Sequence, residues 1–217
     1  MPVRHNAGMV LARDTAMIDH HDKDDATGAE AFDIKAVIKL AEQRHSPLVK
    51  AVSSLGKLGD QEPLYLMGFA ASFAGVFMGR PGLRSAGLAM VANVAAADLA
   101  KQVVKKHVKR TRPERLLEHG LYEAKVGEKK DEKDYNSFPS GHVACTFAAA
   151  RSIAASFPEA RPGGAVATTI IAVARLVKGA HWPMDVLGGL LVGWAASKIT
   201  SALIERSFSK PEAQVGR

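Results

Sequence analysis

The sequence predicts an all-α protein: a membrane-embedded bundle of about five to six helices. Its 217 residues suffice for one domain with a sizeable core. Five apolar stretches of helical length lie between Pro63 and Ile204. Small residues dominate these stretches, as expected where helices approach closely within lipid.

Two segments precede the apolar stretches. Residues 1–30 are polar and irregular, and their pair His20 and His21 lies beside aspartates. This cluster could bind a metal, but it fits a solvated tail better. Residues 31–62 place apolar side chains at helical spacing with lysines between them. The pattern predicts amphipathic helices that lie on a bilayer surface or, alternatively, pack on a soluble core.

The helical domain is expected over residues 63–206, with a C-terminal tail over 207–217. Pro63–Gly79 is uncharged and is the best candidate for a membrane span. The other apolar stretches are Leu83–Val104, Gly141–Phe157, Gly163–Leu176 and Val186–Ile204. The charged segment Glu114–Asn136 is expected to form a loop or short hairpin between helices. Because the mean hydropathy is only −0.02, a soluble Ala-rich bundle is the alternative.

The charge and residue composition limit the classes of molecule that the protein is expected to bind. A formal net charge of +7 favours phosphates, acidic lipid surfaces or nucleic acid. Nucleic acid is not expected, because no zinc finger or recognition helix is visible and aromatic residues make up only 6% of the chain. Cys145 is the sole cysteine, which excludes an internal disulfide and argues against a Cys-based zinc site. The N-terminal segment lacks the apolar core of a secretory signal.

Three short clusters at the ends of apolar stretches carry reactive side chains, and the first is Lys105-x6-Arg112-Pro113. Seven residues are nearly two helical turns, so the spacing predicts both cations on one face of a helix that Pro113 ends. Such a pair can clamp a phosphate, although it would also suit anchoring to lipid headgroups.

The second cluster is Pro139-Ser140-Gly141-His142, at the start of an apolar stretch. Ser140 is expected to cap the helix, and Gly141 lets a ligand approach its free N–H groups. His142 can then donate a proton to a leaving oxygen. The alternative is a plain capped helix with an incidental histidine.

The third cluster is Arg175-x5-His181-x3-Asp185. Pro183 is expected at the first helical position, so that Asp185 reaches back to one ring nitrogen of His181 and leaves the other as a nucleophile. The alternative is a capping pair with Arg175 facing headgroups. Taken together, the three clusters supply the cations, the histidines and the carboxylate of a complete phosphoryl-transfer site that needs no metal or other cofactor.

These clusters resemble the signature of the type-2 phosphatidic acid phosphatase superfamily, which is K-x6-RP, then PSGH, then SR-x5-H-x3-D. The resemblance spans about Lys105 to Asp185. The family includes lipid phosphate phosphatases, prenyl diphosphate phosphatases, soluble bacterial acid phosphatases and vanadium haloperoxidases, and the apolar stretches fit its helical core. One position departs: Ala174 stands where the family usually has Ser or Thr, which removes a hydroxyl near the phosphate.

The resemblance implies a metal-independent phosphatase that acts on a phosphorylated lipid. His181 would attack phosphorus to give a phosphohistidine, His142 would protonate the leaving oxygen, and Asp185 would orient His181. The phosphate would be held by Lys105, Arg112, Ser140, Gly141 and Arg175. Candidate substrates are a polyprenyl phosphate or diphosphate, a polyprenyl phosphosugar phosphate, or phosphatidylglycerophosphate. The alternatives are a soluble acid phosphatase or vanadate-dependent haloperoxidase on the same fold, and a non-catalytic membrane protein that binds anionic lipids.

The expected location is a bacterial-type inner (cytoplasmic) membrane. With five spans, the many Lys and Arg residues between Lys105 and Arg115 lie on the same side as the site. The positive-inside rule then directs the site toward the cytoplasm. A sixth span over residues 31–57 would move the charges of the N-terminal tail to the other side.

Overall fold

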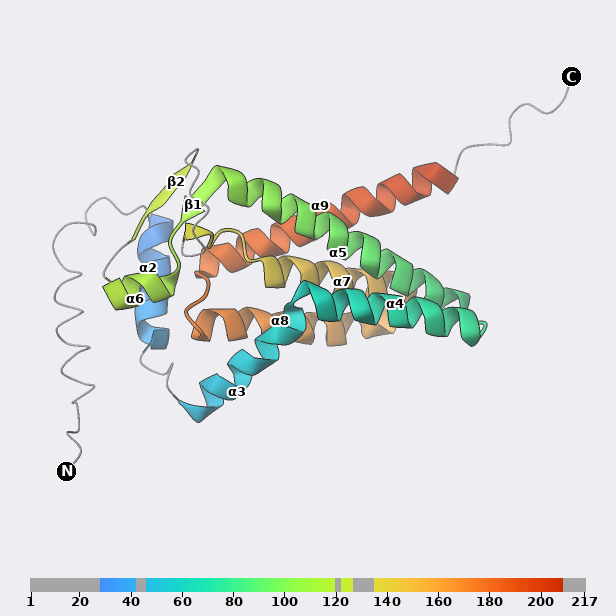
Figure 1. Ribbon diagram of the computed structural model, residues 1–217, viewed down its shortest axis with the longest axis horizontal. Coiled ribbons are helices and arrows are strands. Elements are labelled where there is room, and N and C mark those ends of the chain that lie inside the picture. Colours follow the sequence, from blue (N-terminus) through green and yellow to red (C-terminus); the bar gives the residue numbers. More distant parts are fainter. Residues whose placement is uncertain (1–27, 42–45, 120–121, 127–134, 209–217) are drawn as a thin grey trace, which may run out of the picture.

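The computed structural model of the protein describes residues 28–41, 46–119, 122–126 and 135–208 (Figure 1). Its helices are α2 (Gly28–Ala41), α3 (Pro47–Leu55), the 3-10 turn η1 (Gly56–Gly59), α4 (Gln61–Phe77), α5 (Pro81–His107), α6 (Pro113–His119), α7 (Gly141–Ser156), the 3-10 turn η3 (Pro158–Ala160), α8 (Arg161–Val177) and α9 (Pro183–Phe208). Strands β1 (Val108–Arg110) and β2 (Ala124–Val126) pair antiparallel, with Val108 opposite Val126. The His20–His21 pair and most of both predicted tails lie outside the described residues.

Each of the five apolar stretches forms a helix, so the predicted all-α fold is confirmed. Within the described residues, three helical segments are long and apolar enough to cross a membrane: Pro81–His107, Pro158–Val177 and Pro183–Leu203. Helix α4, expected to be the best span, has 17 residues. At about 1.5 Å per residue it measures about 26 Å, somewhat less than the roughly 30 Å hydrocarbon core of a bilayer.

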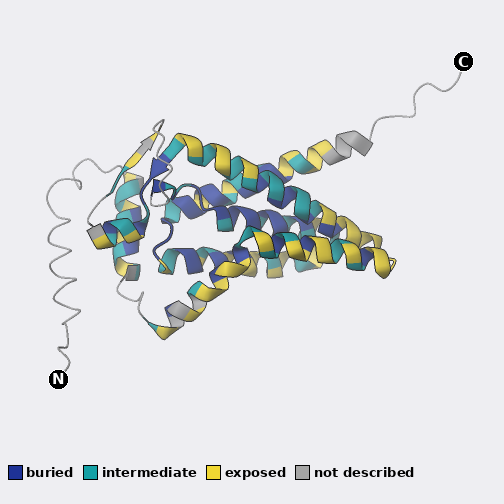
Figure 2. Cartoon of the chain, in the orientation of Figure 1, coloured by how far each residue is buried: buried dark blue, intermediate teal, exposed yellow. Residues whose placement is uncertain are grey.

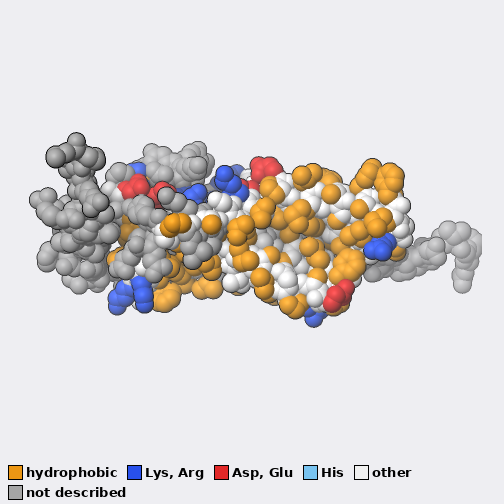
Figure 3. All heavy atoms as spheres, turned by 90° about the horizontal axis from the view of Figure 1, so that it is seen from below, with side chains coloured by type: hydrophobic (Ala, Val, Ile, Leu, Met, Phe, Trp, Pro, Cys, Tyr) orange, Lys and Arg blue, Asp and Glu red, His pale blue; other side chains and the backbone are white. Residues whose placement is uncertain are grey.

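The surface of the bundle is suited to lipid. Leu66, Phe73 and Phe77 on α4 are 70%, 66% and 75% exposed. Further large apolar side chains are exposed on α5, α8 and α9, and hydrophobic atoms cover much of the bundle in the space-filling view (Figure 3). A soluble bundle would bury such side chains or replace them with polar ones. The protein is therefore a membrane-embedded helical bundle.

Helix α7 forms the centre of the bundle and packs against α5, α8 and α9, and the buried residues concentrate there (Figure 2). The main core cluster consists of Leu64, Met90, Val94, Ala97, Cys145, Ala148, Ala149 and Ala196. Its many alanines let the helices approach closely. A second cluster, formed by Val37, Leu116 and Trp182, joins α2 and α6 to the loop before α9.

Helices α2 and α6 and both strands gather at one end of the bundle, opposite the turn between α4 and α5 (Figure 1). The end of α5 and the starts of α7 and α9 also lie at this end (Figure 1). All three sequence clusters are therefore brought to the same end of the molecule.

The prediction that Lys105 and Arg112 share a helix face is wrong. Helix α5 ends at His107, residues 108–110 form β1, and Pro113 begins α6 instead of ending α5. The pairing of β1 with β2 satisfies backbone groups through a partner far along the chain, which helical periodicity does not reveal. The segment Glu114–Asn136, expected as a loop or hairpin, contains α6 and β2.

Candidate active site

Charged interactions link the predicted site residues across several elements. Lys105 at the end of α5 and Arg112 before α6 both act electrostatically on His181. His142 in the first turn of α7 interacts with Arg175 and with His181. The side chains predicted from the three clusters thus converge on one place.

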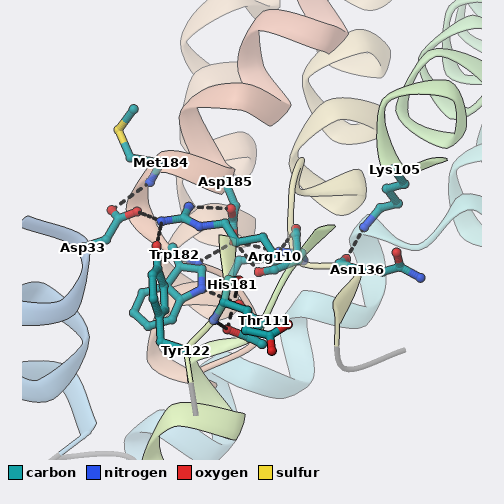
Figure 4. Close-up of polar contacts among 12 residues, drawn as sticks. Asp33, Lys105, Arg110, Thr111, Tyr122, Asn136, His181, Trp182, Met184 and Asp185 are labelled. Atoms are coloured by element: carbon teal, nitrogen blue, oxygen red, sulfur yellow. Dashed lines mark hydrogen bonds and ion pairs between the residues drawn. The ribbon is translucent and has the colours of Figure 1, made fainter. Parts of the chain in front are cut away.

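His181 lies in the loop between α8 and α9, and it is 3% exposed. Its Nδ1 is 2.8 Å from the carbonyl oxygen of Ser137 and 3.6 Å from Oδ2 of Asp185 (Figure 4). A carbonyl oxygen can only accept, so Nδ1 carries the ring proton and Nε2 keeps its lone pair. The ring orientation predicted from Asp185 alone therefore depends on two partners, of which Ser137 is the closer.

Burial lowers the pKa of His181, and the charges of Arg112 and Lys105 lower it further, whereas Asp185 raises it. The lowering effects dominate, which favours the neutral imidazole. A neutral ring with a free Nε2 is the form that can act as a nucleophile.

Asp185 is fully buried in the first turn of α9, which begins at Pro183 as predicted. Its Oδ2 accepts hydrogen bonds from the backbone N–H of Trp182 at 2.8 Å and from the hydroxyl of Ser137. Its Oδ1 accepts one from Arg110 at 2.9 Å. These donors leave the carboxylate little freedom to rotate.

Arg110 and Asp33 were not predicted to belong to the site. The Arg110 guanidinium donates to Asp185 and, at 2.6 Å, to Asp33 of α2. Although burial lowers it, Asp185, Tyr122 and Asp33 together hold the pKa of Arg110 above its usual value, so this arginine stays charged. The buried carboxylates thus share a permanent cation.

His142 faces Asp60, the residue that precedes α4. The carboxylate Oδ1 of Asp60 accepts a hydrogen bond from Nε2 of His142. A carboxylate partner requires a proton on that nitrogen. To act as a general acid the ring must carry a second proton on Nδ1; burial and Arg175 disfavour that charged form, and Asp60 favours it. Asp60 was also missed by the sequence analysis.

Two polar groups among the predicted phosphate ligands are buried without a hydrogen-bond partner in the described part of the chain: Ser140 Oγ and Arg175 Nε. Ser140 occupies the predicted N-cap position of α7, but its side chain makes no capping bond. Arg175 lies against Gly56, where a Cβ would come within 2.8 Å of its guanidinium. Both groups can therefore turn toward an anion at the start of α7.

Two lysines of α5 border the same place. Lys105 donates from Nζ to the backbone oxygen of Asn136. Lys101, one turn earlier, packs over Gly141: a Cβ on that glycine would lie 2.7 Å from Lys101 Cδ. Lys101 also pairs with Asp98 at 2.7 Å. It was not among the predicted ligands.

Among the residues that the structure describes, no three His, Cys, Asp or Glu side chains are grouped to hold a metal ion. The charge that a metal would supply to a phosphoryl group can come here from lysine and arginine side chains. The absence of a metal requirement stays a prediction.

The missed residues had weak sequence signals. Arg110 stands two residues before Arg112 and is one of six basic residues between Lys105 and Arg115, so nothing in the sequence distinguishes it. Asp33 lies 77 positions from its partner Arg110. Asp60 follows a glycine at a helix start, a position that also suits ordinary capping.

The sequence matches the model of the family described as the PAP2 superfamily over residues 86–209. Two curated relatives are lipid A 1-phosphatases. The one from Rhizobium johnstonii is 27% identical over 52% of this chain and 46% of the relative. The one from Rhizobium etli is 27% identical over 55% of this chain and 51% of the relative. The chain thus spans about half the length of the curated relatives it matches.

Two solved structures share the fold. One is a transmembrane PAP2-type phosphatidylglycerolphosphate phosphatase from Bacillus subtilis, with a TM-score of 0.60, 18% identity and coverage of 95% of this chain and 96% of that one. The other is LpxE from Aquifex aeolicus, with a TM-score of 0.56, 19% identity and coverage of 83% of this chain and 98% of that one. At these identities the likeness extends to the fold alone.

Proposed function

Because the chain belongs to the PAP2 superfamily, we propose that it is a membrane phosphatase that hydrolyses a lipid phosphate monoester or diphosphate through a phosphohistidine intermediate, without a metal. The observation that carries this function is the environment of His181. Its Nδ1 is engaged by the Ser137 carbonyl, its Nε2 is left as the reactive nitrogen, and Lys105 and Arg112 act on the ring.

In the first step, Nε2 of His181 attacks phosphorus and the bond from phosphorus to the lipid oxygen breaks. His142 gives its proton to that leaving oxygen. The three cations Lys105, Arg112 and Arg175 stabilise the charge on the remaining phosphoryl oxygens, with Ser140 and Gly141 at the helix start. Asp185 offsets the positive charge that the His181 ring acquires.

In the second step, water attacks the phosphohistidine. His142, now neutral, takes a proton from that water, and the bond from phosphorus to Nε2 breaks to release inorganic phosphate. The ring of His181 returns to its starting tautomer, with Nδ1–H still held by Ser137. His142 thereby regains the proton it had lost.

The lipid part of the substrate is supported by the three candidate spans and by the exposed apolar side chains of α4. Phosphorylated lipids also stand in the names of the relatives, one a lipid A 1-phosphatase and one a phosphatidylglycerolphosphate phosphatase. Polyprenyl phosphates or diphosphates, polyprenyl phosphosugar phosphates and phosphatidylglycerophosphate are the candidate classes. A soluble acid phosphatase or haloperoxidase would have no use for such a surface.

The test of function is phosphate release in detergent from a panel of lipid phosphates and diphosphates. The wild-type protein should release phosphate from at least one of them, and His181→Ala should reduce turnover to background while the Tm changes little. Turnover of His181→Ala at the wild-type rate would contradict the assigned nucleophile. Binding of the same lipids without turnover by the wild type would favour a non-catalytic lipid-binding protein.

We further propose an inner-membrane location with the site toward the cytoplasm, on the basis of the basic residues around it. Glu118 on α6 is exposed at this end of the bundle, and the natural Cys145 is fully buried. In intact cells, a cysteine introduced by Glu118→Cys should therefore resist a membrane-impermeant maleimide and react after lysis. Reaction in intact cells would place the site on the outer side.

A further inference from the structure

Helix α2 holds a buried carboxylate against the site, although it lies outside the residues matched to the family (86–209). Asp33 is 0% exposed. Its Oδ2 accepts a hydrogen bond from Arg110 at 2.6 Å, and its Oδ1 accepts one from the backbone N–H of Met184 at 3.1 Å (Figure 4). Asp33 thus ties α2 to β1 and to the first turn of α9.

Arg110 bridges two carboxylates. One guanidinium nitrogen donates to Asp185 at 2.9 Å, and the other donates to Asp33 and, at 3.1 Å, to the hydroxyl of Tyr122. The rings of Tyr122 and Trp182 lie 5.9 Å and 5.4 Å from the guanidinium carbon. A planar guanidinium can satisfy this fork, whereas a lysine ammonium cannot reach both carboxylates in the same way.

The charges of this group depend on one another. Two carboxylates buried close together repel unless a cation lies between them. Burial raises the pKa of Asp33, and Arg110 and the backbone N–H of Met184 oppose that rise. With both carboxylates ionised, the group of Asp33, Arg110 and Asp185 carries a single net negative charge. Without Asp33, Arg110 would neutralise Asp185 and leave His181 without net negative support. The other charged or titratable groups that act on His181 are Lys105 of α5, Arg112 before α6 and His142 of α7.

Building on the phosphatase function above, we propose that Asp33 and Arg110 are positioning residues for the nucleophile. Arg110 holds Asp185 so that its Oδ2 faces the ring of His181. Asp33 offsets the charge of Arg110, so that Asp185 still stabilises the positive charge that His181 gains on attack. Helix α2 is then part of the catalytic apparatus and not only a helix lying on the bilayer.

Two substitutions test these roles because they change the charge in opposite directions. Asp33→Asn removes a negative charge with little change of shape. It should lower kcat about 10–100-fold at similar KM, and should move the acid limb of the kcat profile to lower pH by about half a unit or more. Arg110→Met removes a positive charge, so kcat should also fall but the acid limb should move to higher pH. A merely structural defect would lower the amount of active protein without moving either limb.

Controls keep the test decisive. Glu62→Gln removes an exposed carboxylate from α4 and should change neither kcat nor the limb. If Arg110→Met does not fold, Arg110→Lys keeps the charge but loses the fork, and should lower kcat with a smaller shift of the limb. If the acid limb of the kcat profile stays at its wild-type pH in both Asp33→Asn and Arg110→Met, the proposed positioning roles of Asp33 and Arg110 are wrong. The pKa of His181 can also be followed by NMR without any substrate, so failure to find a hydrolysed lipid would be distinguished from failure of this charge coupling.

An independent observation points to a second site, between α7 and α8. A cavity of about 380 Å³ there is lined by Phe147 and Arg151 of α7, by Arg161 of α8, and otherwise by alanines and a glycine. Arg151 is nine residues beyond His142, or about 13 Å along the helix, so the cavity is separate from the catalytic residues.

The cations of this cavity are not compensated within the described part of the chain. Arg151 Nε is buried without a hydrogen-bond partner, and its guanidinium lies 6.0 Å from the ring centre of Phe147. Within the described ranges, neither Arg151 nor Arg161 forms an ion pair, including with the exposed Glu159 nearby in sequence. Arg151 is partly buried, whereas Arg161 is exposed. A partly buried cation without a counter-charge is costly, so a phosphate group that Arg161 can also reach would relieve the cost at Arg151.

Helix α8, which carries Arg161, also presents an apolar surface. Val166, Ile170 and Val173 of α8 are 58%, 39% and 42% exposed. Their spacing places them on one face of α8, roughly opposite the face of Arg161, Gly164 and Ala165 that lines the cavity, and the helix belongs to a segment long and apolar enough to span a membrane. Because this apolar surface places α8 in lipid, we infer that the cavity binds the phosphate of an anionic phospholipid in the leaflet opposite the catalytic site.

Thermal unfolding in detergent tests this binding, with saturating orthophosphate in every sample to occupy anion sites at the His181 end. Phosphatidylglycerol at about 100 times its Kd should raise the Tm by about 5 °C or more, and phosphatidylcholine should not. The rise should disappear in Arg151→Gln/Arg161→Gln. It should persist in Arg80→Gln/Arg84→Gln, which removes exposed arginines at the same end of the bundle. Arg161→Glu alone serves if the double variant does not fold.

Three results would overturn the phospholipid site. One is an equal rise in the Arg151/Arg161 variant and the wild type, and another is an equal rise with phosphatidylcholine. The third is a Tm in orthophosphate that phosphatidylglycerol does not raise, together with a smaller orthophosphate-induced rise over phosphate-free protein in the Arg151/Arg161 variant than in the wild type, which would indicate a free anion as the ligand of the cavity.

Discussion

Gly189 is the position where a single methyl group should disturb the site most directly. It lies on α9 one turn beyond Asp185 and faces the start of α7. A Cβ at this position would come within 2.6 Å of the backbone oxygen of Ser140 and 3.2 Å of the Cβ of Val143. The neighbour is backbone and cannot rotate away, so Gly189→Ala must push α9 and α7 apart.

The size of the effect follows from these distances. Non-bonded heavy atoms prefer separations of about 3.5 Å, so a contact of 2.6 Å calls for a displacement of somewhat under 1 Å. Asp185 and His181 would move with α9, and His142 with α7. A misplacement of about 1 Å can reduce turnover about 100-fold, so kcat should fall about 10–100-fold. Overpacking should also lower the free energy of unfolding by about 1–3 kcal/mol.

The assay compares kcat, KM and Tm with a matched glycine-to-alanine change elsewhere. Gly163 in the first turn of α8 has nothing within 4 Å of its Cβ position. Gly163→Ala should leave kcat unchanged and raise stability by about 0.4–1 kcal/mol, because alanine restricts the unfolded chain. Wild-type kcat and Tm for Gly189→Ala would refute the inference that close packing of α9 on α7 sets the alignment of the two histidines.

Three further predictions concern the chemistry directly. Burial, Arg112 and Lys105 lower the pKa of His181, and the nucleophile must be neutral. The value of kcat/KM should therefore persist below pH of about 6.5 and be lost only as the pH falls through the lowered pKa. A loss of activity on the acid side that sets in at or above pH of about 6.5 would contradict this. Asp185→Asn should lower kcat by about 10³–10⁴ with little change in KM. Ser137→Ala keeps the backbone carbonyl that accepts from Nδ1 of His181, so it should lower kcat only about tenfold. Equal losses of kcat in the two variants would contradict the larger role given to Asp185. Activity should survive EDTA, and a loss reversed by one particular divalent ion would show that a metal takes part.

The helices of this bundle could be predicted because their cause is local. Each apolar stretch is long enough to form a helix by itself, and Ser140 and Pro183 mark two helix starts through preferences of single residues. The end of α5 at His107 could not be predicted in the same way. It depends on pairing between Val108–Arg110 and Ala124–Val126, and three-residue strands carry no usable periodicity.

The site divides along the same line. His142, His181 and Asp185 stand in short motifs whose spacing predicts phosphoryl-transfer chemistry, so they could be proposed as site residues from the sequence. The groups that hold them are distant: Ser137 lies 48 positions from Asp185, and Arg110 lies 75 positions from it. These contacts arise only after the bundle has folded. An isolated serine such as Ser137, or one arginine among several basic residues such as Arg110, gives no sequence pattern that predicts them.

The distribution of charge around His181 explains why its carboxylates need an arginine. In the proposed reaction, a lipid phosphate approaches from the side of the cations, and a bare carboxylate behind the ring would repel it across a poorly screened interior. Arg110 reduces that repulsion without removing Asp185, because Asp33 restores one negative charge on the far side of the guanidinium. The remaining charge lies where it can stabilise the ring of His181 during attack, and farther from the phosphoryl oxygens. An arginine paired with Asp185 alone would remove both the repulsion and the stabilisation, so under the proposed mechanism Asp33 is the residue that keeps Asp185 useful to His181.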